Sequence, residues 1–213
     1  MKTEELVTLL ANGVVAVDPH VAARRYALAL GAGAIGALAL LLMLLGVRSD
    51  LREAVSQPLF WIKIGFVASL LAASLFAALR LSRPGMRLDA VPVALAAPVV
   101  ALWIVAGITL LDAEASQRSA LLLGQTWKSC PWLIALLSTP VFVGTLWAMR
   151  GLAPTRPRLA GFAAGLLAGA TAALVYCLHC PEVETPFIGV WYVLGMAIPA
   201  GVGAALGERL LRW

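Results

Sequence analysis

Charged residues are scarce in this chain of 213 residues: Asp, Glu, Lys and Arg make up 13% of it, whereas hydrophobic residues make up 62%. A soluble domain carries about 25% charged residues, and a core of this size cannot hide so large an apolar excess. The mean hydropathy of +0.92 points the same way. These values exclude an ordinary soluble fold, and we expect lipid to solvate much of the surface.

Several motifs are also missing. No segment alternates in polarity as the strands of a membrane β-barrel do, and neither a Walker loop nor an H-E-x-x-H motif is present. The string from Gly31 to Gly36 matches G-x-G-x-x-G but lies inside an apolar run, where it cannot bind a dinucleotide. The start, with Glu4 and Glu5, lacks the basic character of a cleavable signal peptide. We therefore expect a protein without a cofactor.

What the chain has instead is six long apolar runs, each near the roughly 20 residues that a spanning helix needs. Only helices satisfy every backbone group within such a run in lipid. The sequence therefore predicts an all-α, polytopic fold with a cytoplasmic segment 1–25, a six-helix membrane domain 26–207 and a cytoplasmic tail 208–213. The expected spans are residues 26–47, 59–79, 91–111, 132–149, 159–178 and 187–206.

The distribution of basic residues predicts the orientation, because short cytoplasmic connectors are enriched in Lys and Arg. With both termini inside the cell, the outer connectors hold four basic residues, Arg48, Arg52, Arg118 and Lys128. The inner segments then hold eleven: Lys2, Arg24, Arg25, Arg80, Arg83, Arg87, Arg150, Arg156, Arg158, Arg209 and Arg212. Basic connectors of this kind explain the pI of about 9.6 without nucleic-acid binding.

One basic residue, Lys63, lies within a predicted span, about one turn from its outer end. We expect it to snorkel to the lipid headgroups, and a role in ion or proton movement is the alternative. No acidic residue lies near the middle of a span, which disfavours a proton-coupled transporter.

Small residues and prolines predict how the helices pack. Glycines let helix backbones approach closely in lipid, and prolines inside spans kink helices and serve either motion or packing. The glycines expected at helix contacts are Gly31, Gly36, Gly161, Gly165, Gly169, Gly201, Gly203 and Gly207, and the internal prolines are Pro98, Pro140 and Pro199.

The cysteines are the most informative polar residues. Cys130 precedes the fourth predicted span and Cys180 follows the fifth, so both fall on the outer side at similar depth. Each is followed by a proline that marks a helix end. A static disulfide or two idle thiols, a thiol sensor, and a thiol–disulfide enzyme are all compatible with this placement. Cys177 and Cys180 form a C-x-x-C pair, but at a helix C-terminus, which disfavours thiolate. We interpret Cys177 as a packing residue.

Other ligand-type side chains surround Cys180. Thiolates and imidazole suit soft cations such as zinc, copper or cadmium, so His179, Cys130 and Cys180 form a candidate metal set if their loops meet. Solvated loop residues are the simpler interpretation for His179, and also for Glu182 and Glu184.

The N-terminal segment has helical character. Thr3 is a suitable cap, Asn12-Gly13 a suitable stop, and Leu6, Leu9 and Leu10 line one face. This helix either docks in a groove of a partner or lies on the membrane or the bundle.

These features together resemble a known family. The start MKTEELVTLL, the six spans, and one cysteine at each of two outer helix ends, in WKSCPW and LHCPE, are similar to the NrsF-type anti-sigma factors. The resemblance implies an inner-membrane protein of Gram-negative bacteria that holds an extracytoplasmic-function sigma factor inactive. It also implies that the periplasmic cysteines of the family fall on Cys130 and Cys180 and sense heavy-metal or oxidative stress. Cys177 has no counterpart in that pattern.

The resemblance thus favours a regulator over an enzyme. The sigma factor would bind at the cytoplasmic face, with Leu6, Leu9 and Leu10 as contacts suggested only by amphipathicity. A membrane thiol–disulfide oxidoreductase that passes electrons to quinone and a metal-ion transporter remain the alternatives from other classes.

Overall fold

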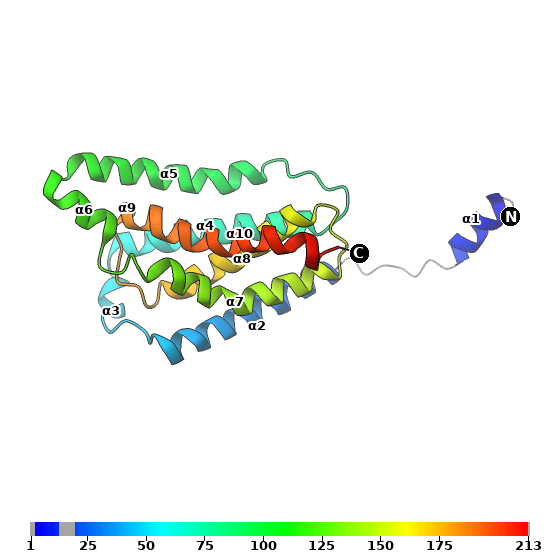
Figure 1. The fold of residues 1–213 in the computed structure, drawn as a ribbon, viewed down its shortest axis with the longest axis horizontal. Helices are drawn as coiled ribbons and strands as arrows, with labels where there is room; N and C mark the ends of the chain where they lie inside the picture. The colour runs from blue at the N-terminus through cyan, green and yellow to red at the C-terminus, as the bar shows by residue number, and fades with distance from the viewer. Residues whose placement is uncertain (1–2, 13–19, 213) are drawn as a thin grey trace.

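The computed structural model describes residues 3–12 and 20–212, which form helices joined by short connectors, with no strand among them (Figure 1). Six helices are long and apolar enough to cross a membrane, as the hydropathy predicts, and the chain is a multi-pass membrane protein. The spans are α2 (Val21–Leu44), α4 (Pro58–Leu81), α5 (Val91–Asp112), α7 (Cys130–Arg150), α8 (Pro157–Tyr176) and the run of α9 (Thr185–Phe187), η1 (Ile188–Tyr192) and α10 (Val193–Leu210). The largest shift is at α2, which begins at Val21 rather than at residue 26.

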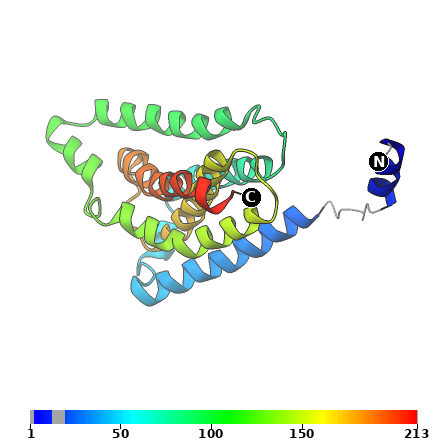
Figure 2. The ribbon, with the colours of Figure 1, turned by 45° about the vertical axis from the view of Figure 1, so that its right-hand side comes forward.

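Three short helices complete the described chain: α1 (Thr3–Asn12), α3 (Leu51–Ala54) and α6 (Ala115–Leu123). In both Figure 1 and Figure 2, α1 lies apart from the six long helices. It ends at Asn12, where the sequence predicts a stop.

The central helix of the bundle is α8, which packs against α4, α7 and α10. Helix α2 packs on α7, whereas α5 lies at the edge and contacts α4 and the start of the last span. This arrangement follows from composition, because α8 is rich in Gly and Ala and permits close approach on several sides. It is also the most buried of the six spans.

Glycines form the closest helix contact. A Cβ atom at Gly161 would collide with the carbonyl of Gly203, and one at Gly165 with the carbonyl of Pro199. Gly169 and Gly207 also lie at the α8–α10 contact. The prediction of a glycine-lined contact is therefore confirmed for α8.

At one position of α2 and one of α10 the glycine assignments were wrong, whereas that of Gly36 is confirmed. Gly31 and Gly201 have open space where a side chain would lie. Gly33 is the α2 glycine in tightest contact, against Val141, and Gly36 packs on Pro140. Sequence spacing identifies a small-residue face, but the rotation of the helix about its axis decides which glycine is covered.

The bundle has two ends with different contents (Figure 1). The terminal end carries the start of α2, the end of α10 and the connectors 82–90 and 151–156. The cysteine end carries α3, α6 and the connector 177–184. Cys130, the first residue of α7, and Cys180, within the connector 177–184, are thus at the same end of the molecule.

Candidate functional site

Cys130 and Cys180 meet at the cysteine end. Cys130 is the first residue of α7, and Cys180 lies in the connector between α8 and α9. Both are free, fully buried thiols, and they lie beside each other in one buried cluster. The structure therefore brings together two residues that are 50 positions apart in the sequence.

Local backbone geometry holds each cysteine at a helix end. The Cys130 N–H donates to the carbonyl of Thr126 at 2.9 Å, which closes a turn before α7, and proline follows at a position where helices tolerate it. The Cys180 N–H donates to the carbonyl of Tyr176 at 3.0 Å and so extends the end of α8. Pro181 has no N–H and ends this turn.

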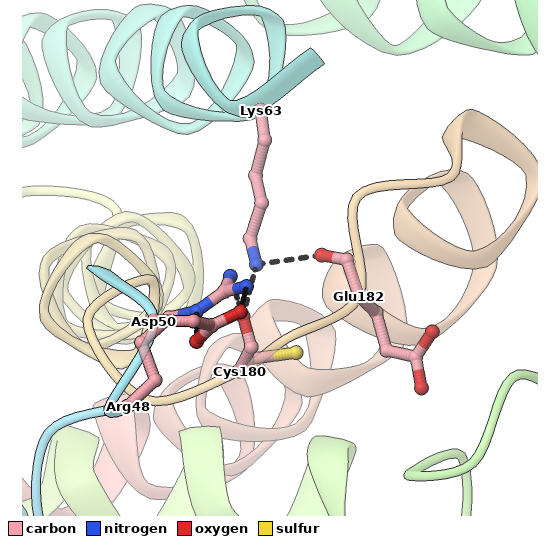
Figure 3. Close-up of polar contacts among 5 residues, drawn as sticks. All are labelled: Arg48, Asp50, Lys63, Cys180 and Glu182. Carbon is pink, nitrogen blue, oxygen red and sulfur yellow. Dashed lines mark hydrogen bonds and ion pairs between the residues drawn. The ribbon is translucent and has the colours of Figure 1, made fainter. Parts of the chain in front are cut away.

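Lys63 on α4 forms hydrogen bonds with the connector 177–184, which carries Cys180. Its side chain is fully buried, and Nζ donates to the carbonyl oxygens of Cys180 at 3.1 Å and Glu182 at 2.9 Å (Figure 3). The expectation that Lys63 snorkels to the headgroups was wrong. The side chain turns inward because two backbone carbonyls there satisfy its ammonium group.

Arg48 supplies a second cationic donor. Its guanidinium pairs with Asp50 at 2.6 Å and also reaches the Cys180 carbonyl at 3.3 Å (Figure 3). The backbone N–H of Arg48 donates a hydrogen bond to the Leu178 carbonyl at 3.0 Å. The connector after α2 is thereby attached to the connector that carries Cys180.

Glu182 attaches that connector to the turn before α7. Its carboxylate points away from Lys63 in Figure 3 and accepts a hydrogen bond from the Gln125 N–H at 2.7 Å. The turn passes through Gly124, whose φ of 53° is unfavourable for other residues, and a side chain there would meet the Glu182 carboxylate. The structure thus gives Glu182 a partner where the sequence suggested a solvated side chain.

Cys177 and Tyr192 extend the buried cluster inward. Cys177 donates its S–H to the Ala173 carbonyl at 3.2 Å, in keeping with a packing role. Tyr192 ends the π-helical turn η1, and its buried hydroxyl has no hydrogen bond of ordinary geometry among the described residues. That hydroxyl lies beside the sulfurs of Cys177 and Cys180. No sequence signal indicated the π-helical turn.

The two thiols of the 177–184 connector differ in acidity. The neighbouring Cys130 thiol lowers the pKa of Cys180, and the nearby Lys63 ammonium acts in the same direction against the effect of burial. Burial raises the pKa of Cys177 to about 11. Cys180 is therefore the more acidic of the two thiols, and thiolate character is what makes a cysteine nucleophilic.

The proposed metal set does not converge as a whole. The His179 ring nitrogen Nδ1 lies 3.0 Å from the Gly46 carbonyl, and the ring packs on Tyr176. Across residues 3–12 and 20–212 no group of three or more His, Cys, Asp or Glu side chains is placed to hold a metal ion. Of the three proposed ligands, Cys130 and Cys180 lie beside each other, whereas the His179 ring nitrogen Nδ1 lies at the Gly46 carbonyl.

The suggested sigma-factor contacts lie on α1. Leu6 is exposed on this helix. Leu9 and Leu10 belong to the helix backbone, but their side chains lie outside the described part of the structure. The connectors 82–90 and 151–156 at the terminal end of the bundle expose three basic side chains, Arg83, Arg87 and Arg156.

Comparison with known proteins gives a consistent result. The family model described as NrsF, negative regulator of sigma F, matches residues 10–213. The chain is 62% identical to a probable anti-sigma-F factor NrsF from Azospira oryzae, and 39% identical to the anti-sigma-F factor NrsF from Caulobacter vibrioides, in both cases over the whole of each protein. No solved structure matches the chain. With its spans and its cysteine pair in the arrangement described above, the chain belongs to the NrsF family of negative regulators of sigma F.

Proposed function

We propose that this protein lies in the bacterial inner membrane, binds an extracytoplasmic-function sigma factor at its terminal end, and releases it when periplasmic Cys130 and Cys180 react. The placement of the two free thiols beside each other in one buried cluster is the observation that carries this proposal. Two free thiols that lie side by side can either form a disulfide or bind one ion together.

The chemistry of each signal is simple. With hydrogen peroxide as oxidant, the two thiols lose two protons and two electrons, an S–S bond forms, and the hydrogen peroxide is reduced to two molecules of water. With a soft divalent cation such as cadmium, the two sulfurs bind the ion and release two protons. Both reactions draw the sulfurs together or insert an atom between them, and both require an oxidising or metal-exposed compartment.

A change at the pair reaches the terminal end through rigid elements. Helix α7 begins at Cys130 and ends at Arg150, and α8 begins at Pro157, so the connector 151–156 joins two helices that meet at the cysteines. The two helices pack along their length. A tilt at one end would therefore change the arrangement of basic connectors at the other, and sigma affinity would differ between the two states.

Serine variants test the role of the pair. We expect Cys130→Ser and Cys180→Ser, singly and together, to abolish induction of sigma-dependent transcription by cadmium or peroxide, because one sulfur can neither form a disulfide nor bridge an ion. Cys177→Ser is the matched control, buried in the same cluster, and should retain induction. A reporter gene under the cognate promoter provides the measurement.

Unchanged induction in the Cys130 and Cys180 variants would exclude the pair from signalling. Partner binding is tested separately by co-purification of the sigma factor with the full chain and with a chain that lacks residues 1–12. Equal recovery with both chains would contradict binding through α1.

A further inference from the structure

Lys63 is a buried cation whose presence the membrane domain does not explain. It lies within α4, has no solvent exposure, and in residues 3–12 and 20–212 forms no salt bridge with a carboxylate. A charged group at such a position is strongly unfavourable unless hydrogen bonds replace its hydration. Such residues within spans mark functional positions more often than structural ones.

The contacts of Lys63 converge on one segment. The carbonyls of Cys180 and Glu182 both accept hydrogen bonds from Nζ, and the ammonium also lies over the Tyr192 ring, 4.8 Å from its centre. The two carbonyls flank Pro181, which donates no hydrogen bond. The cation therefore anchors a stretch that has few internal bonds of its own.

This stretch determines where the Cys180 sulfur lies. At one end of the stretch, the Cys180 N–H is bonded to the last turn of α8. At the other end, the Glu182 carboxylate accepts a hydrogen bond from the Gln125 N–H in the turn before Cys130. Without an anchor on α4, the residues between these two attachments can rotate, and the thiol can leave its position against Cys130. The positive charge of Nζ also lowers the pKa of the Cys180 thiol.

We propose that Lys63 is a positioning residue of the cysteine pair, which holds the Cys180–Glu182 backbone so that the Cys180 thiol faces the Cys130 thiol. The importance of this for signalling rests on the proposed function, but the geometric effect does not. Charge-assisted hydrogen bonds are about twice as strong as neutral ones, so the ammonium is well suited to this task.

The test measures disulfide formation in the purified full-length protein that carries Cys177→Ser, so that only the paired thiols remain. Diamide serves as the oxidant, because it accepts the two electrons and two protons that the thiols release. We expect Lys63→Met to slow formation of the Cys130–Cys180 bond by about tenfold or more, the factor associated with loss of one charge-assisted hydrogen bond. Lys63→Arg should restore most of the rate.

Two further variants keep the test decisive. Lys63→Gln retains one neutral donor and should give an intermediate rate, and it replaces Lys63→Met as the deciding variant if the latter does not fold. Arg48→Met removes the longer contact to the Cys180 carbonyl together with the ion pair to Asp50, but leaves both Lys63 hydrogen bonds in place, and should have the smaller effect. Thermal unfolding of each variant shows whether it is folded at the assay temperature, so that rates of disulfide formation are compared only among folded proteins.

Wild-type rates in Lys63→Met or Lys63→Gln would overturn the inference. So would equal slowing by Arg48→Met and Lys63→Met without restoration by Lys63→Arg, because that result indicates general loss of loop structure. The assay contains no sigma factor, so its outcome is independent of the reporter experiment. Failure of the serine variants to affect induction would remove the proposed function but leave the measured rates intact.

Discussion

Single hydrogen bonds join the connectors at the cysteine end. Glu182 is the clearest case, because its carboxylate reaches across to the backbone N–H of Gln125 and its carbonyl is held by Lys63. One residue thus links α4, the Cys180 connector and the turn before Cys130. The bond is charge-assisted, and such bonds are stronger than those between neutral groups.

We therefore predict that Glu182→Gln lowers the free energy of unfolding by about 1 kcal/mol, the difference between a charged and a neutral acceptor. Glu184→Gln is the control, because Glu184 lies two residues away in the same connector and no hydrogen bond of its carboxylate is recorded in the described structure. Denaturant unfolding in detergent would measure both. A larger loss in Glu184→Gln than in Glu182→Gln would contradict the role of the Gln125 contact.

At the scale of helices, the α8–α10 contact decides how the bundle closes. The backbones approach so closely that the carbonyls of Gly203 and Pro199 occupy the space of a side chain on α8. Such contact depends on dispersion and on the absence of side-chain bulk, since lipid supplies no hydrophobic drive between helices. Pro199 takes part in the contact, and Pro140 packs on Gly36, so these two prolines have a packing role.

Glycine substitutions test this contact. Gly161→Ala should destabilise the protein by roughly 1–3 kcal/mol, because the added methyl forces the helices apart. Gly201→Ala, on the same pair of helices but facing open space, should change stability by less than about 0.5 kcal/mol. The free energy of unfolding reports both, and equal effects at the two positions would show that α8 and α10 are not packed as described.

At the scale of the molecule, the two ends differ in charge and in chemistry. The terminal end carries most of the basic residues, and the cysteine end carries the thiols and few basic residues. The charge difference is the basis for the proposed orientation, in which the terminal end faces the cytoplasm. The proposed direction of signalling depends on this orientation.

Labelling of single cysteines tests the orientation. In a chain without native cysteines, Gln117→Cys at the exposed α6 should react with a membrane-impermeant maleimide in cells with a permeabilised outer membrane. Met86→Cys, exposed in the connector after α4, should react only after the inner membrane is lysed. The reverse pattern would place the thiols inside the cell and overturn the proposed direction.

The sequence by itself determined the number of spans, their helical nature and the placement of Cys130 and Cys180 on one side. These properties follow from composition along the chain, because lipid requires each span to satisfy its own backbone. The glycine face of α8 was also predictable from the sequence, because the spacing of its glycines matches the helical repeat.

Only the tertiary structure decided which side chains those helices turn inward. Lys63 turns from the lipid toward the Cys180 connector, Gly33 rather than Gly31 packs on α7, and Tyr192 reaches the thiols through a π-helical turn. Each outcome depends on the rotation of a helix and on partners distant in the sequence. Hydropathy is insensitive to both, because it measures transfer to lipid and not contact between helices.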